Sequence, residues 1–136
     1  MSQYLIFLAI LPLICFEICK LFRCSYKNTI YGISLGLVIT PVSFALVQFT
    51  YIPVIGKFIG LVGLLVHLVH CWFGYGCMIG MGVLEPGATV STMQLDLVHS
   101  LNGLFFAIIY GLAGYFRDLR IRNTVFTRSI FPKLSY

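Results

Sequence analysis

Charged residues are scarce in this sequence. Of its 136 residues, 10% are charged and 60% are hydrophobic, and the mean hydropathy is +0.98. Soluble domains carry about 25% charged residues, so this composition excludes an ordinary water-soluble domain. The length predicts one domain, and the composition predicts a membrane protein.

The sequence also lacks several short motifs of common active sites. It contains no HExxH, CxxC or Walker pattern and no glycine-rich phosphate loop. Its five cysteines lie within or beside apolar segments, so we expect free thiols rather than a disulfide scaffold. We therefore expect neither enzymatic activity nor a cofactor.

Four apolar runs have about the length of a membrane-spanning helix, which needs about 20 residues. They cover residues 4–22, 30–49, 58–84 and 95–116. Backbone groups in lipid need internal partners, so each run is predicted to be a helix. Ser91, followed three residues later by Gln94, predicts a capping box at the start of the last helix. No basic residue precedes the first run and no cleavage pattern follows it, so we expect it to be retained rather than removed as a signal peptide.

These patterns predict an all-α, multi-pass integral membrane protein. We expect a compact bundle of four transmembrane helices in a single domain, residues 1–116, in a plasma (inner) membrane. Residues 117–136 are basic and aromatic without the length of a span, so they predict an interfacial tail.

Basic residues cluster after the first run and after the last, at Lys20, Arg23 and Lys27 and at Arg117, Arg120, Arg122 and Arg128. Membrane anchoring explains most of the net charge of +5, so we expect no nucleic-acid partner. The arginines of the second cluster are predicted to contact anionic lipid headgroups.

Two topologies are open. Four full spans place the two basic clusters on opposite sides of the membrane, which partly breaks the positive-inside rule. If the run 30–49 instead bends at Pro41 and returns to the side from which it came, both clusters lie inside. Re-entrant backbone, however, must be buried in protein. A label at Ser25 would distinguish the two.

Small residues and histidines form stripes at helical spacing. In membranes, small residues mark the places where helices meet, so the histidines are expected to face protein. We expect the stripe of the last run to pack closely against that of the third. The predicted packing seam comprises Gly60, Gly63, His67, His70, Gly74 and Cys77 with Gly103, Ala107 and Gly111.

The histidines allow a structural role or a functional one. Pro41 has no N–H, so the carbonyl of Leu37 loses its helical donor, and we expect His70 to donate to this carbonyl or to pair with Thr40. Alternatively, an ionisable group at mid-membrane indicates function. A polar or proton path would then involve His67, His70, Asp96 and His99.

A haem or metal site is the third reading. His67 and His70 lie one turn apart on one predicted helix, so they cannot clasp one iron from both sides. In an antiparallel pairing of the last two helices, His99 lies about 10 Å of helix rise from His70. We therefore expect no haem held within one chain and assign no metal ligands. A zinc site that combines His67 and Cys71 with Cys15 and Cys19 across two helices stays open as an alternative.

The leading hypothesis is a non-enzymatic membrane protein that acts by helix-to-helix association. Its partners would be the lipid bilayer and either further copies of itself or the other subunits of a membrane complex. The alternatives are a small oligomeric transporter or channel with a polar path lined by histidine and aspartate, and a haem- or metal-binding subunit.

Overall fold

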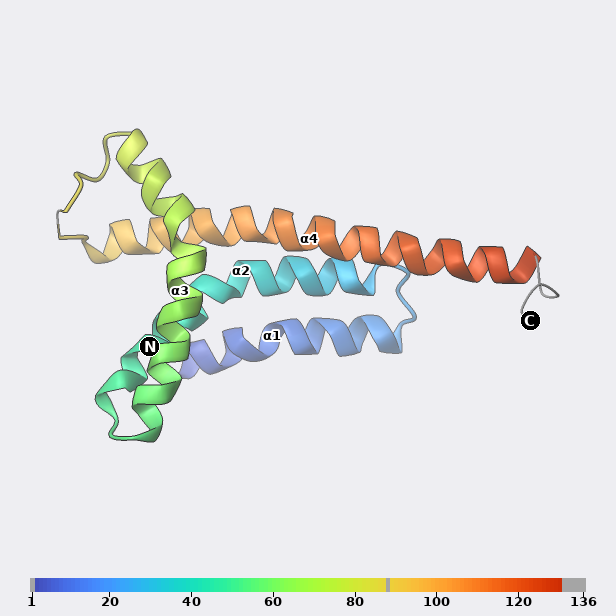
Figure 1. The fold of residues 1–136 in the computed structure, drawn as a ribbon, viewed down its shortest axis with the longest axis horizontal. Coiled ribbons are helices and arrows are strands. Elements are labelled where there is room, and N and C mark those ends of the chain that lie inside the picture. Colours follow the sequence, from blue (N-terminus) through green and yellow to red (C-terminus); the bar gives the residue numbers. More distant parts are fainter. Residues whose placement is uncertain (1, 88, 131–136) are drawn as a thin grey trace.

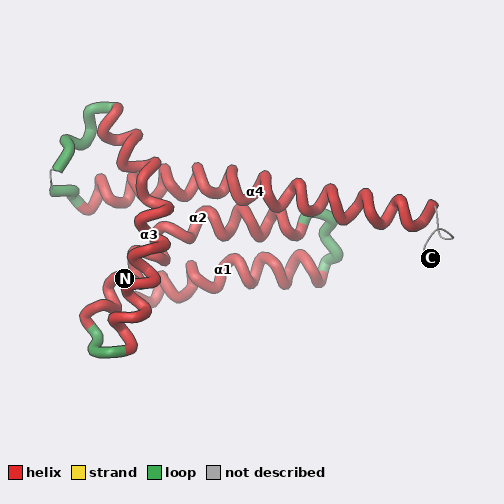
Figure 2. Tube along the Cα trace, viewed as in Figure 1, coloured by secondary structure: helices red, strands yellow, loops and turns green. Residues whose placement is uncertain are grey.

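The structure, a computed structural model, describes residues 2–87 and 89–130, with side chains described between residues 10 and 123. Within these residues the chain is helical and has no strand. The elements are α1 (Ser2–Leu21), α2 (Lys27–Val47), the 3-10 helix η1 (Gln48–Tyr51), α3 (Ile55–Gly80) and α4 (Thr92–Ile130) (Figures 1 and 2). The predicted all-α class is confirmed.

The predicted helix bounds hold to within a few residues, with one exception. The last helix does not end at residue 116, because α4 continues through Arg117 to Ile130. The predicted capping box starts α4, since Ser91 N donates to Gln94 Oε1 (3.0 Å) and Gln94 N donates to Ser91 Oγ (3.3 Å). The turn after α3 contains Gly82 with a φ of +70°, a conformation that glycine adopts without a steric penalty.

Three of the helices lie side by side. α2 lies between α1 and α4, and it runs antiparallel to both (Figure 1). α2 and α4 approach so closely that a Cβ on Gly36 would overlap the backbone of Phe106 and Ala107, and one on Gly114 would overlap the backbone of Asn28. Glycine at these positions is what allows the two backbones to meet.

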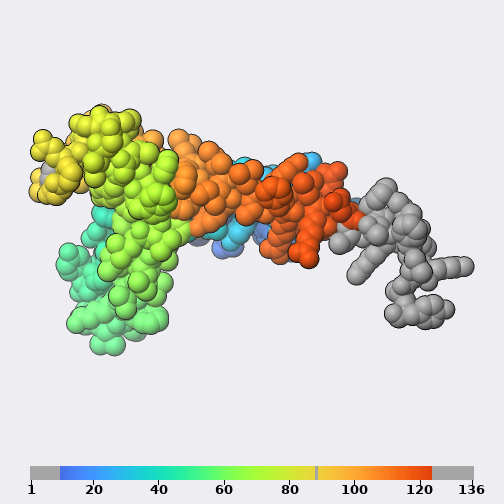
Figure 3. All heavy atoms as spheres, turned by 45° about the horizontal axis from the view of Figure 1, so that its top comes forward, coloured from blue at the N-terminus to red at the C-terminus, as the bar shows by residue number. Residues whose placement is uncertain are grey.

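α3 has a different direction from α1, α2 and α4. α3 begins beside the end of α2, where a Cβ on Gly63 would lie 2.5 Å from Leu46 Cβ. It then crosses α2 and α4 instead of running along them (Figures 1 and 3). At the crossing, the rings of Phe73 and Phe105 stack with 3.9 Å between their centroids. The expected antiparallel pairing of α3 with α4 is therefore wrong.

Because α3 crosses the other helices, the order of the helix ends differs from the alternating order predicted from the sequence. The turn between α1 and α2 lies beside the later part of α4, where Tyr26 contacts Arg122. The two basic clusters therefore share one end of the molecule, here called the basic end, whereas four alternating spans would separate them. α2 is helical through Pro41 and does not return to the basic end, so the re-entrant alternative is wrong, while the number of membrane spans stays a prediction. α3 breaks the alternation, because it begins and ends at the far end.

Among the residues that the structure describes, three helical segments are long and apolar enough to cross a membrane: Lys27–Tyr51, Ile55–Gly80 and Thr92–Asn123. The predicted first span falls on α1. The burial pattern differs from that of a soluble domain. Large apolar side chains such as Phe58, Leu65 and Leu68 are exposed, although Met78 and Val98 are fully buried. Among the described residues, the buried polar side chains are Ser34, Thr40, Ser43, His70, Asn102 and Asp118.

Candidate functional site

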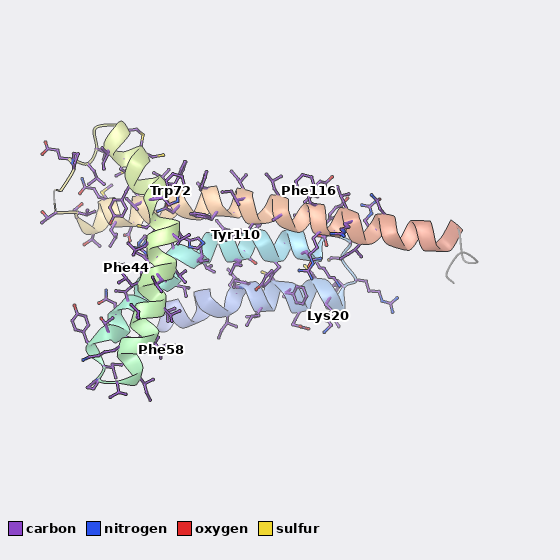
Figure 4. The ribbon with its side chains drawn as sticks, in the orientation of Figure 1. Lys20, Phe44, Phe58, Trp72, Tyr110 and Phe116 are labelled. Carbon is purple, nitrogen blue, oxygen red and sulfur yellow. The ribbon has the colours of Figure 1, made fainter. Side chains whose placement is uncertain are left out.

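The three histidines gather where α3 crosses α2 and α4. α3 contributes His67 and His70, and α4 contributes His99. Figure 4 shows Phe44, Trp72 and Tyr110 around this crossing, with Lys20 and Phe116 toward the basic end. We call His67, His70 and His99, with Ser43 and Tyr110, the histidine cluster.

His67 is bound to α2 through a short chain of hydrogen bonds. Ser43 Oγ donates to the carbonyl of Thr40 (2.8 Å), so its oxygen is left to accept from His67 Nδ1 at 3.2 Å. A neutral His67 therefore carries its proton on Nδ1, and Nε2 is left as an acceptor. The side chain thus ties α3 to α2 rather than reaching open solvent.

His70 connects α3 to α4. Its Nδ1 lies 2.7 Å from the carbonyl oxygen of Val66, which can only accept, so Nδ1 carries the proton. Its Nε2 then accepts from the hydroxyl of Tyr110. The expected partners, Leu37 and Thr40, are not its partners. The cause is the direction of α3, which brings His70 to α4 instead of the Pro41 region of α2.

His99 is the least satisfied histidine. Its ring lies 5.9 Å from that of His67, edge to face, and 5.2 Å from that of Phe44. Among the described residues, His99 Nε2 and the fully buried Thr40 Oγ1 are the buried side-chain polar atoms without a hydrogen-bond partner. His99 was expected too far from His70 to be its partner. The crossing brings it to His67 instead.

The predicted polar path is therefore only partly assembled. His67, His70 and His99 meet, but Asp96 is exposed one turn before His99. Phe44 and Phe106 pack against the rings of the cluster, at 5.6 Å from His67 and 4.5 Å from His70. This apolar surrounding suits a fixed helix contact better than a wet channel.

Asn102 of α4 forms hydrogen bonds to α3 at the same crossing, and the sequence analysis did not predict this role. Gly74 N donates to Asn102 Oδ1 (2.6 Å), and Asn102 Nδ2 donates to the carbonyl of Cys71 (3.0 Å). The residue is fully buried. Its position three residues after His99 on an apolar helix was the available signal, because a polar residue on the buried face of such a helix seeks a partner.

Asp118, also missed, caps α2 from α4. Its carboxylate accepts from the backbone N–H of Thr29 (2.9 Å), the hydroxyl of Thr29 (2.8 Å) and the side-chain amide of Asn28 (2.6 Å). Tyr26, at the N-cap of α2, supplies no side-chain cap. Asp118 thus satisfies N–H groups at a positive helix end. The available signal in the sequence was that Asp118 is the single acidic residue among the basic residues 117–136.

The α3 part of the predicted seam faces more than one neighbour. Gly60 packs against Thr50 of η1 and Gly63 against Leu46 of α2, whereas Gly74 packs against Asn102 of α4. Gly60, Gly63 and Gly74 are buried, and Cys77 and His67 are half-buried.

The α4 part of the seam was expected against α3 and instead packs on α2. A Cβ on Gly103 would lie 3.0 Å from the carbonyl oxygen of Leu37, and one on Gly111 would lie 2.7 Å from Ile33 Cγ1. Ala107 lies against Gly36. The expectation was wrong about the partner because the small-residue stripes of α2 and α3 are alike in sequence.

The predicted headgroup residues lie at the basic end. Arg117, Arg120 and Arg122 are exposed, and the side chain of Arg128 lies outside the described residues. Arg122 Nη1 donates to Tyr26 Oη (2.9 Å), and its guanidinium carbon lies 5.7 Å from the Tyr26 ring centroid. The α1–α2 turn and the later part of α4 are thereby joined.

Within the described residues, no group of three or more His, Cys, Asp and Glu side chains is placed to hold a metal ion. The five cysteines are free thiols, as expected. Compared with family models, with curated proteins and with solved structures, the chain matches none. Its function is therefore argued from its own geometry.

Proposed function

We propose that this chain is a multi-pass integral membrane protein of the plasma (inner) membrane that acts through helix-to-helix association. The burial pattern supports embedding in lipid, since many large apolar side chains are exposed while His70, Asn102 and Asp118 are buried. Polar groups in a bilayer are stable when they face protein. The basic end, with both clusters, would face the cytoplasm.

The composition and length of α3 fit this setting. Lys57 is the single Lys, Arg, Asp or Glu among residues 55–80, so α3 lacks the charged face that an interfacial helix needs. A helix of 26 residues is about 39 Å long, which is enough to cross a hydrocarbon core of about 30 Å. We therefore place α3 in the hydrocarbon rather than at its surface.

One observation supports association in particular. Most glycines in the described helices lie close to atoms of another element, but a Cβ on Gly76 or Gly80 would have nothing within 4 Å. These two residues form a GxxxG spacing beside the exposed side chains of Val69 and Trp72. GxxxG surfaces let two membrane helices approach closely. We call Val69, Trp72, Gly76 and Gly80 the α3 glycine face, and a second copy is its proposed partner.

Co-purification of two differently tagged copies in mild detergent tests this proposal. Wild-type copies are expected to co-purify after co-expression, and the double variant Gly76→Leu, Gly80→Leu is expected to lose most of this association while its thermal stability stays unchanged. Ala113→Leu is the matched control, because it adds a leucine at another exposed helical position. Double-variant copies that co-purify as well as wild type would reject the role of this face. Wild-type copies that never co-purify would reject the homo-oligomer and favour an accessory subunit.

A proton-carrying role is the second candidate. The unpartnered Nε2 of His99, beside His67, is the observation that favours it. Proton flux into liposomes should then change between about pH 5 and 8, where histidine titrates. His99→Gln should abolish this flux, and Asp96→Asn, at an exposed position, should leave it unchanged. Flux that is absent or insensitive to His99→Gln would reject this candidate.

A further inference from the structure

An apolar groove runs along the outer side of the α2–α4 pair. Ile33 and Leu37 line it from α2, and Leu104 and Ile108 line it from α4. These four side chains are exposed, and the groove has a volume of about 480 Å³. In lipid, a groove of this kind is filled by acyl chains or by another helix.

The depth of the groove matches one leaflet of a bilayer. From Leu104 to Tyr115, which both line it, α4 rises about 16 Å, and half of a hydrocarbon core of about 30 Å is about 15 Å. Tyr115 stacks on Tyr26, with 6.0 Å between the ring centroids. Tyrosines are typical of the headgroup level of a membrane. The groove therefore extends from the headgroup level to about the midplane.

A cation lies directly beyond this tyrosine pair. Arg122 donates one N–H to Tyr26 Oη and lies over the Tyr26 ring. A guanidinium has five N–H donors, and Tyr26, which accepts here, keeps its own proton to donate. The nearest carboxylate along the helix, that of Asp118, is turned to the start of α2. A phosphate oxygen at this position would receive charge-assisted hydrogen bonds.

We propose that the α2–α4 groove binds one acyl chain of an anionic glycerophospholipid, and that Arg122 and Tyr26 hold its phosphate. The positive charge of the basic end complements the net negative charge of such a lipid and opposes the choline of a zwitterionic one. The inference rests on the membrane embedding of the proposed function but not on self-association.

Thermal unfolding of the full chain in detergent tests this site, with three probes: phosphatidylglycerol, phosphatidylcholine with the same acyl chains, and inorganic phosphate. A ligand that binds the folded state raises the unfolding temperature with its concentration. Phosphatidylglycerol is expected to do so, whereas phosphatidylcholine and inorganic phosphate are not. Equal stabilisation by phosphatidylcholine, or stabilisation by inorganic phosphate alone, would overturn the proposal.

Two pairs of variants locate the site. Arg122→Gln should raise the phosphatidylglycerol concentration needed for half of the stabilisation about tenfold, because a charge-assisted contact is lost. Lys20→Gln, which removes a positive charge of α1 at the basic end that is paired with Glu17, should change it much less. Ile108→Trp should block the groove and abolish the stabilisation, whereas Leu97→Trp, outside the groove, should not. Arg122→Gln or Ile108→Trp variants that respond like wild type would overturn the proposal, whatever the result of the co-purification test.

Discussion

The α2–α4 interface and the α3 crossing are built differently. Along α2 and α4, glycines such as Gly32 and Gly36 bring two backbones together over several turns. At the α3 crossing, side chains such as His70 and Asn102 make the contacts through hydrogen bonds. Backbone contacts do not tolerate added atoms, whereas side-chain contacts can rearrange. The two interfaces should therefore respond very differently to substitution.

The largest expected effect tests the α2–α4 interface. Gly36→Ala places a methyl group on the backbone of Ala107, so two helices must move apart, and lipid offers no compensating gain. We expect a loss of about 1–3 kcal/mol in thermal unfolding in detergent. Gly111→Ala is the comparison variant, because its methyl group meets Cγ1 of the Ile33 side chain rather than backbone, and it should cost less than Gly36→Ala. Equal costs would mean that α2 and α4 are not in backbone contact.

The next effect tests the end of the same interface. Asp118→Ala leaves the N–H groups of Asn28 and Thr29 without their acceptor, which should cost about 1–3 kcal/mol. Asp96→Ala removes a carboxylate of equal size from an exposed position and should change the unfolding temperature little. An Asp118→Ala variant as stable as wild type would show that α4 does not cap α2.

A smaller effect is expected at the crossing. Hydrogen bonds between membrane helices contribute about 0.6 kcal/mol on average, and about 1.7 kcal/mol at most. A double-mutant cycle of His70→Ala and Tyr110→Phe should give a coupling energy in this range. The cycle of His70→Ala with Tyr115→Phe, whose hydroxyl is not bound to His70, should give none. A coupling near zero for Tyr110 would place α3 in a different crossing.

The helices and their caps could be predicted from the sequence because both depend on residues close together in the chain. Ser91 and Gln94 are one turn apart, and their reciprocal bonds form as expected. The hydropathy of each run likewise gave the helices to within a few residues, apart from the end of α4. Local patterns thus determine the elements.

The partners of each helix could not be predicted in the same way. Stripes of small residues on α2, α3 and α4 have the same spacing and chemistry, so any pair of them could have met. The direction of α3 depends on contacts such as those of Gly74 and Asn102, which lie far apart in the chain. Because α3 and α4 were expected to pair antiparallel, the predicted positions of His70 and His99 relative to the other helices were wrong. Both histidines nevertheless contact another helix, as expected.

The smallest effect is expected on the outer surface of the α2–α4 pair. Leu104 and Leu112 are 59% and 52% exposed, so Leu→Ala at either position exchanges one apolar surface for another in the presence of detergent. Lipid or detergent covers both forms equally well, and no cavity forms inside the protein, so a change within about 0.5 kcal/mol is expected. Val98→Ala is the control, because Val98 is fully buried against α3 and its truncation leaves a cavity. If Leu104→Ala in lipid-free detergent were as costly as Val98→Ala, this face would be buried against another protein surface. The close α2–α4 contact would then be the interior of a larger assembly rather than the exposed side of a pair.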